Sequence, residues 1–135
     1  MPTTAMSDRE NRHVVVVDDT SEFRRFVARV LERQHFRVTA AGDFASAIDI
    51  IEGRDRIDLL IADVALGPDS PHGVSLCNMA QLRRARLKVI LMSGSHDVHH
   101  AAQYANPAGV LQKPFTARQL IDAVTTALGE AAGAG

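Results

Sequence analysis

The sequence predicts an α/β fold in three layers, an α/β/α sandwich with a five-stranded parallel sheet between two layers of helices. Short apolar runs predict buried strands, amphipathic segments alternate with these runs, and acidic residues directly follow two of them. Because crossovers between parallel strands are right-handed, repeated strand–helix units place helices on both faces of the sheet. A chain of 135 residues has room for one such domain.

The first two strand–helix units begin at His13. The run His13 to Val17 (HVVVV) is nearly all β-branched, which predicts a strand buried on both faces. The helix after it is expected to end near Gln34, and Phe36 to Ala40 is the second predicted strand. Asp43 is the expected N-cap of the second helix. Apolar residues recur at helical spacing in both helices: Phe23, Phe26, Val27, Val30 and Leu31, then Phe44, Ala47, Ile48 and Ile51.

The third and fourth strands flank a loop and a helix. Leu59 to Ala62 (LLIA) is an apolar strand that ends at Asp63. The segment Val64 to Gly73 contains two prolines and two glycines, which predicts a loop. A helix is expected from about Val74 to Arg84, and Lys88 to Met92 (KVILM) is the fourth strand.

The fifth unit has the weakest pattern. A polar loop is expected at Ser93 to Asp97, followed by a helix with little apolar character that ends near Asn106, before Pro107 and Gly109. Val110 to Gln112 is a short fifth strand.

The last helix has clear signals at both ends. Thr116 and Gln119 form a capping box, and Phe115 and Leu120 occupy the hydrophobic-staple positions. Gly129 is the expected C-terminal stop. The buried stripe of this helix comprises Leu120, Ile121, Val124 and Leu128.

Acidic residues follow the first and third strands. In the flavodoxin-like (βα)5 order 2-1-3-4-5, sites form at the carboxyl ends of these two strands. Asp18, Asp19 and Asp63 should therefore meet, and their repulsion favours capture of Mg²⁺, or Mn²⁺ in its place. A carboxylate there can also act as a nucleophile toward phosphorus. Lys113 and Ser93, which end the fifth and fourth strands, are the expected cation and hydrogen-bond donor for a phosphoryl group.

Composition narrows the classes of partner and environment. Fifteen Lys and Arg balance sixteen Asp and Glu, for a net charge of -1, so no global basic field favours direct nucleic-acid binding. The single cysteine, Cys77, cannot form an internal disulfide and is expected to be a small buried residue on a helix. No apolar run approaches a membrane span or a signal peptide, so we expect a cytoplasmic protein that does not bind membranes.

The domain boundaries follow from the same patterns. Residues 1–12 are polar and are expected to form a flexible N-terminal segment, residues 13–128 form the domain, and the Ala/Gly tail at 129–135 is expected to be disordered.

Four strand-end motifs together resemble a known family. VVVVDD at 14 to 19, LLIADV at 59 to 64, LMSGS at 91 to 95 and LQKPF at 111 to 115 are similar to the signature of response-regulator receiver domains, the CheY-like modules of two-component systems. The resemblance spans essentially residues 13 to 128. It implies a signalling module that catalyses only its own phosphorylation and dephosphorylation, not a turnover enzyme.

The resemblance assigns a role to each matching residue. It implies that Asp63 is phosphorylated, that Asp18, Asp19, Asp63 and the backbone carbonyl of Ala65 bind Mg²⁺, and that the hydroxyl and ammonium contacting the phosphoryl group come from Ser93 and Lys113. In this family the lysine–proline peptide is usually cis, so a cis bond is expected between Lys113 and Pro114.

Three features depart from the family pattern or fall outside it. The glycine after the acceptor, Gly73, comes later than usual, which indicates a short insertion in the loop. The family's aromatic switch position is occupied by Val110, and the small residues Ala65 and Ser95 stand where side chains tune dephosphorylation. Two further groups are interpreted as solvated surface: His96, His99 and His100, and the basic run Arg83, Arg84, Arg86 and Lys88.

The resemblance also implies partners. Asp63 would accept phosphate from a sensor histidine kinase or a histidine phosphotransfer protein, and a downstream protein would bind the face of the fourth helix, fifth strand and fifth helix. The sequence does not decide whether the chain forms a homodimer.

Two alternatives remain at this point. A pseudo-receiver would bind partners without phosphorylation, and Val110 keeps this reading open. A haloacid-dehalogenase-type phosphatase would need a second acid at position 20, where this chain has Thr20.

Overall fold

One parallel sheet forms the centre of the molecule. The computed structural model describes residues 9–65, 72–94 and 106–130. The sheet has five strands in the order β2-β1-β3-β4-β5, which confirms the predicted topology. Its strands are β1 (His13–Val17), β2 (Arg37–Ala41), β3 (Leu59–Asp63), β4 (Lys88–Ser93) and β5 (Gly109–Gln112).

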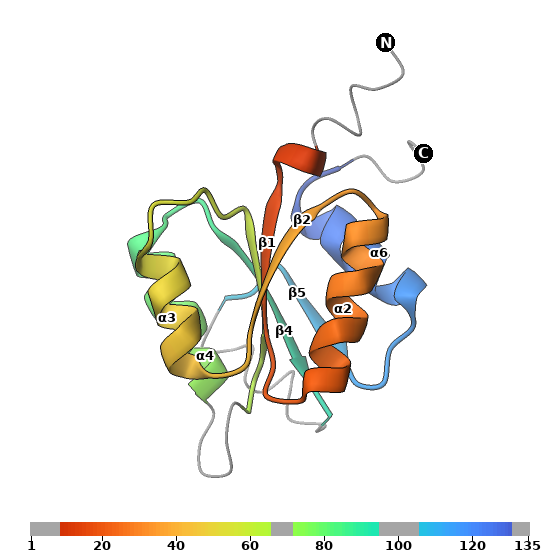
Figure 1. The fold of residues 1–135 in the computed structure, drawn as a ribbon, viewed down its shortest axis with the longest axis horizontal. Helices are drawn as coiled ribbons and strands as arrows, with labels where there is room; N and C mark the ends of the chain where they lie inside the picture. Colours follow the sequence, from red (N-terminus) through yellow and green to blue (C-terminus); the bar gives the residue numbers. More distant parts are fainter. Residues whose placement is uncertain (1–8, 66–71, 95–105, 131–135) are drawn as a thin grey trace.

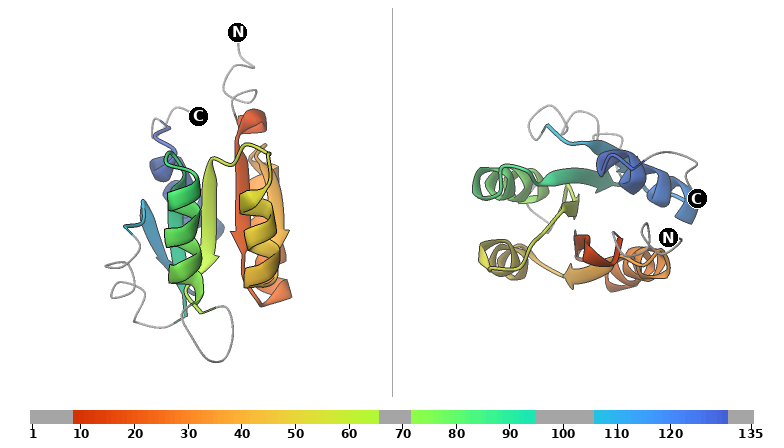
Figure 2. Two further views of the ribbon diagram at one scale, coloured as in Figure 1. Left: turned by 90° about the vertical axis from the view of Figure 1, so that its left-hand side faces the viewer. Right: turned by 90° about the horizontal axis from the view of Figure 1, so that it is seen from above.

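Helices cover both faces of the sheet, as the sequence predicts. The described helices are α2 (Ser21–Arg33), α3 (Phe44–Glu52), α4 (His72–Arg83) and α6 (Ala117–Ala127). In Figure 1, α3 and α4 lie on one side of the sheet while α2 and α6 lie on the other, and both views of Figure 2 show the same layers. The weak helix expected before Asn106 lies outside the described residues.

The strand side chains divide the interior into two cores. Successive residues of a strand point to opposite faces, so Val15 and Val17 pack toward α3 and α4, while Val14 and Val16 pack toward α2 and α6. All five residues of β1 and of β3 are buried. The runs that predicted strands buried on both faces are therefore confirmed, and they hold the two central strand ends in fixed positions.

The predicted helix ends are largely confirmed. The Asp43 carboxylate accepts a hydrogen bond from the Ser46 backbone N–H at 2.7 Å, and this bond lowers the pKa of Asp43. Both bonds of the capping box between Thr116 and Gln119 are present. Gly129 has φ of 73°, the left-handed conformation expected at a helix C-terminus.

The first turn of α4 lies directly against the end of β3. The helix begins at His72, two residues before the predicted start, and the Gly73 N–H donates to the Val64 carbonyl at 3.0 Å. A Cβ atom at position 73 would overlap the backbone carbonyl of Asp63, so only glycine fits this approach. Residues 66–71 of the loop in which we expect a short insertion lie outside the described residues.

One member of the basic run, Arg84, is partly buried and bonds to a neighbouring helix. The Arg84 guanidinium donates to three backbone carbonyls at the end of α3 and just beyond it: Ile51 at 3.0 Å, Gly53 at 2.8 Å and Asp55 at 2.8 Å. The predicted solvated helix end did not include these bonds, because spacing along one helix does not reveal the carbonyls that a neighbouring helix presents. Arg84 joins the C-terminal ends of α3 and α4.

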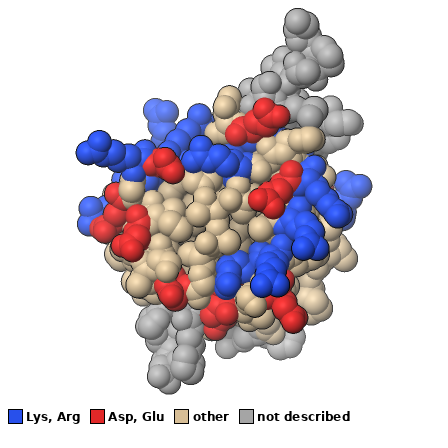
Figure 3. Space-filling view, in the orientation of Figure 1, with Lys and Arg blue, Asp and Glu red and all other residues tan. Residues whose placement is uncertain are grey.

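The surface carries charges of both signs. Figure 3 shows Lys and Arg side chains interspersed with Asp and Glu around one face of the molecule. Near the chain ends, Arg9 donates to Glu130 at 2.8 Å and to the Gln34 side chain at 3.0 Å. Among the described helices, none has the length and apolar character that crossing a membrane requires.

Candidate functional site

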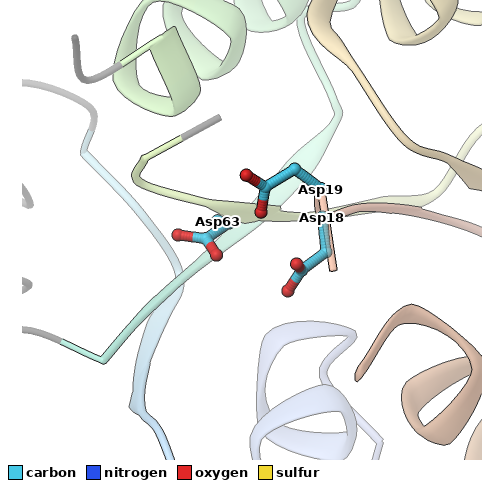
Figure 4. A group of neighbouring side chains, drawn as sticks. All are labelled: Asp18, Asp19 and Asp63. Carbon is cyan, nitrogen blue, oxygen red and sulfur yellow. The ribbon is translucent and has the colours of Figure 1, made fainter. Parts of the chain in front are cut away.

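The ends of β1 and β3 bring three carboxylates together. The two strands are hydrogen-bonded neighbours in register, with Val17 beside Ala62, so Asp18, Asp19 and Asp63 project from the same edge of the sheet. One carboxylate oxygen from each of the three lies within 4.8 Å of the other two. Figure 4 shows the three side chains converging at this edge. The sequence-predicted cluster is thus assembled by strand pairing.

Asp18 is the fully buried member of the cluster, and hydrogen bonds hold it in place. Its side chain is fully buried, and its Oδ1 accepts a hydrogen bond from the Thr20 backbone N–H at 2.8 Å. The Arg24 guanidinium donates to the Asp18 backbone carbonyl at 2.7 Å. These bonds fix the turn that leads from β1 into α2 and orient the Asp18 carboxylate.

Lys113 closes the opposite side of the cluster. Its backbone N–H donates to the Ser93 carbonyl at 2.7 Å, which ties the end of β5 to the end of β4. Its Nζ lies 2.7 Å from Asp18 Oδ2 and 2.7 Å from Asp63 Oδ2. The Lys113–Pro114 peptide bond is cis, the geometry expected from the sequence.

The site alters the pKa of both partners. Burial raises the pKa of the Asp63 carboxyl, and hydrogen bonds from Lys113 and the Ala65 N–H, the latter at 3.0 Å, only partly oppose this. Burial disfavours the Lys113 ammonium, but the hydrogen bonds to Asp18 and Asp63 and the negative charges of these two acids together outweigh burial and raise its pKa. Lys113 therefore stays charged between the two acids.

The remaining predicted residues lie around this centre. Ser93 ends β4, the strand that pairs with β3, and is buried. Ala65 is exposed two residues after Asp63. Val110 is partly buried and packs against the core on the α3 and α4 side. Ser95 and the three histidines at 96, 99 and 100 lie outside the described residues.

The donor set fits a hard divalent cation. Three carboxylates face one ammonium, so the cluster keeps an excess of negative charge after the Lys113 ion pairs are counted. Carboxylate and carbonyl oxygens are the ligands that Mg²⁺ prefers, and exposure of Asp19 and Ala65 leaves one side of the cluster open to water. Nothing in the arrangement selects a softer metal.

Sequence reasoning missed three residues that shape the site. Phe23 lies with its ring centroid 4.3 Å from Lys113 Nζ, Arg24 holds the Asp18 carbonyl, and Gly73 lets α4 approach Asp63. Phe23 was placed only in the apolar stripe of its helix, and Gly73 was noted only as a late glycine in the loop after Asp63, without its contact to the Asp63 carbonyl. Phe23 and Gly73 meet residues of other elements, and Arg24 bonds a carbonyl six residues back across the turn from β1 to α2, so helix periodicity does not signal these contacts.

Comparisons with known proteins agree with this geometry. A family model for the response regulator receiver domain matches residues 14–125. The response regulator receiver protein CpdR of Brucella abortus is 28% identical over 120 residues, which cover 84% of this chain and 93% of CpdR. The transcriptional regulatory protein FixJ of Azorhizobium caulinodans is 33% identical over 128 residues, which cover 93% of this chain and 59% of FixJ.

Solved structures show the same architecture. A CheY-like receiver domain protein from Methanospirillum hungatei superposes with a TM-score of 0.78 at 23% identity, covering 87% of this chain and 94% of that one. The BeF3-activated DrrB receiver domain gives a TM-score of 0.76 at 25% identity, covering 88% and 98%. Since the family model matches most of the chain and includes the acidic cluster and Lys113, this chain belongs to the response regulator receiver domain family.

Proposed function

We propose that this receiver domain accepts a phosphoryl group on Asp63 from a phosphohistidine. The observation that carries the proposal is the position of Lys113 Nζ, 2.7 Å from both Asp18 Oδ2 and Asp63 Oδ2, within a cluster of three acids. The ammonium of Lys113 contacts the Asp63 carboxylate and could also contact the phosphoryl oxygens once the group is bound to Asp63. Such preorganised charge is the main requirement of phosphoryl transfer.

In the proposed reaction, an oxygen of the Asp63 carboxylate attacks phosphorus. The bond from phosphorus to the imidazole nitrogen breaks, its electron pair stays on the imidazole, and an acyl phosphate forms on Asp63. Lys113 holds the phosphoryl oxygens from one side. Ser93, at the neighbouring strand end, supplies a hydroxyl to the same oxygens.

The acidic residues are assigned to Mg²⁺. Asp18, Asp19, Asp63 and the Ala65 carbonyl would hold it. When bound, this cation neutralises charge on the phosphoryl oxygens and removes the repulsion that three carboxylates would present to an anionic donor. Mn²⁺ satisfies the same oxygen ligands.

The role in the cell that we propose is a signalling switch, not a turnover enzyme. The phosphoryl group would come from a sensor histidine kinase or a phosphotransfer protein in the cytoplasm. A downstream protein would bind the face that includes β5 and α6, in a population shift driven by the new charge. The helix before Asn106, which belongs to this expected face, lies outside the described residues.

The test uses small phosphoryl donors and intact mass. Incubation with phosphoramidate and Mg²⁺ should add one phosphoryl group to the wild type and none to Asp63→Asn. Asp122→Asn, which removes an exposed acid on α6, serves as the matched control and should be phosphorylated like the wild type. Chelation of Mg²⁺ should stop the reaction.

The other outcomes discriminate the alternatives. A wild type that gains no phosphoryl group from phosphoramidate, acetyl phosphate or a purified histidine kinase would leave a pseudo-receiver that only binds partners. Many turnovers of p-nitrophenyl phosphate per protein would instead indicate a phosphatase.

A further inference from the structure

An aromatic ring covers the ammonium at the centre of the site. Lys113 Nζ lies 4.3 Å from the centroid of Phe23, a residue in the first turn of α2. A lysine ammonium within about 6 Å of a ring centroid is attracted by the negative face of the ring, most strongly where water is excluded. The Lys113 side chain has a relative exposure of only 17%. The contact therefore lies in the range where this attraction matters.

The ring completes the surroundings of the ammonium. A lysine ammonium has three N–H donors, and the two carboxylates of Asp18 and Asp63 account for two directions at 2.7 Å each. Phe23 approaches the same nitrogen from α2. Carboxylates and ring together restrict where Nζ can go, whereas a flexible four-carbon side chain alone would not.

Other aromatic residues fix the Phe23 ring. Phe115 meets it edge to face, with centroids 5.1 Å apart and planes at 88°. Phe26 lies 5.8 Å away on the next turn of α2. Phe115 belongs to the core on the α2 and α6 side, opposite to the core that Val110 contacts. The aromatic contact to the site thus comes from the face of the sheet opposite to the valine at the usual switch position.

We propose that Phe23 is a positioning residue whose ring holds the Lys113 ammonium between Asp18 and Asp63 for phosphoryl transfer. This inference rests on the proposed function, because it assigns Phe23 a part in the same reaction. Leucine or methionine would fill the space but would lack the negative ring face. The chemistry of the contact therefore distinguishes positioning from packing.

The decisive experiment varies the electrostatics of the ring at nearly constant shape. Phenylalanine analogues with one, two and three ring fluorines, placed at position 23 of the full chain, progressively weaken the negative face. The initial rate of phosphorylation by phosphoramidate should fall stepwise, by roughly three- to tenfold over the series. The same analogues at position 36, whose ring faces the Arg9 guanidinium at 5.1 Å and lies just before β2, at the opposite end of the strands from the site, are the matched control and should leave the rate unchanged. A rate that stays constant or rises across the series at position 23 would overturn the proposal.

A second measurement tests the contact without any reaction. In a cycle of Phe23→Leu, Lys113→Met and the double variant, unfolding by urea reports whether the two side chains stabilise each other. We expect Phe23→Leu to increase the unfolding equilibrium constant by roughly three- to tenfold more when Lys113 is present than when it is absent. Equal effects in both backgrounds would show that Phe23 and Lys113 do not stabilise each other, and would overturn the inference.

The two measurements separate the possible failures. If the wild type is never phosphorylated, the proposed function fails, while the cycle still reports on the contact. If phosphorylation occurs normally but ignores the fluorine series, only the role of Phe23 is rejected.

Discussion

Cys77 illustrates how burial controls the chemistry of one residue. Its side chain is fully buried on α4, and this burial raises the pKa of the thiol from 9.0 to about 12. Because the thiolate is the reactive species, the folded protein should protect Cys77 from alkylation. The sequence-based interpretation of Cys77 as a small buried residue agrees with this environment.

The prediction for Cys77 is therefore that thiol labelling reports unfolding. At pH 8, 5,5′-dithiobis(2-nitrobenzoic acid) should react with the native protein only as fast as the protein opens, and at once in urea. The raised thiol pKa also means that stability is lost as pH rises from 9.0 toward about 12, because the unfolded chain gives up this proton first. Fast labelling of the native protein would contradict the prediction.

At the scale of elements, the approach of α4 to β3 depends on Gly73. A Cβ atom there would meet the Asp63 carbonyl and the Val64 backbone, so the helix would have to move. We expect Gly73→Ala to lower the free energy of unfolding by about 1–3 kcal/mol, the cost typical of overpacking, and to slow phosphorylation of Asp63. Urea unfolding and the phosphoramidate assay measure the two effects.

Gly94→Ala is the matched control for this prediction. A Cβ atom at position 94 meets nothing within 4 Å in the part of the chain that the structure describes, so this variant should keep wild-type stability. Similar losses in both variants would mean that the general cost of replacing glycine, and not the contact with Asp63, explains the result.

The link between α3 and α4 depends on Arg84. Three backbone carbonyls at the end of α3 and just beyond it accept hydrogen bonds from its guanidinium. Arg84→Met should lower the free energy of unfolding by about 1–2 kcal/mol, since two of these bonds are exposed and contribute less than buried ones. The measurement is urea unfolding beside Arg86→Met, which removes an exposed arginine and should change little. If Arg84→Met leaves the free energy of unfolding unchanged, water replaces the guanidinium at these carbonyls without loss of stability.

At the scale of the whole molecule, Mg²⁺ should act as a stabilising ligand. A cation that binds only the folded state stabilises it by mass action, about 1.4 kcal/mol at ten times the dissociation constant. We expect Mg²⁺ to raise the midpoint of thermal unfolding in the wild type and not in Asp18→Asn or Asp19→Asn. Calorimetry with and without Mg²⁺ measures these midpoints. Equal increases in all three proteins would show that the ion binds outside the acidic cluster.

The same shift should depend on pH. Burial raises the pKa of Asp63 above its ordinary value of 3.8, so the folded state keeps this proton to a higher pH than the unfolded chain. Without metal, the contribution of Asp63 to stability therefore decreases as pH rises from about 4 through the raised pKa. Mg²⁺ competes for the deprotonated carboxylate, so its stabilising effect should grow over this same window. A shift in unfolding midpoint that is independent of pH would contradict the assignment of Asp63 as a ligand.

The sequence by itself determined the sheet, its order and the strand-end residues of the site. The reason is local: β-branched runs such as that ending at Val17 are typical of strands buried on both faces, and parallel strands end at a shared edge. Asp18 and Asp63 therefore had to meet once the order was known, and capping residues such as Asp43 and Thr116 acted through neighbours along the chain.

Only the tertiary structure decided which distant segments touch. The ring of Phe23 over Lys113, the carbonyls around Arg84 and the close approach of Gly73 each join residues separated by ten or more positions. Periodicity reveals the face on which a side chain lies but not the atom that it meets there. Those contacts are set by how the layers pack against the sheet, which is a property of the whole fold.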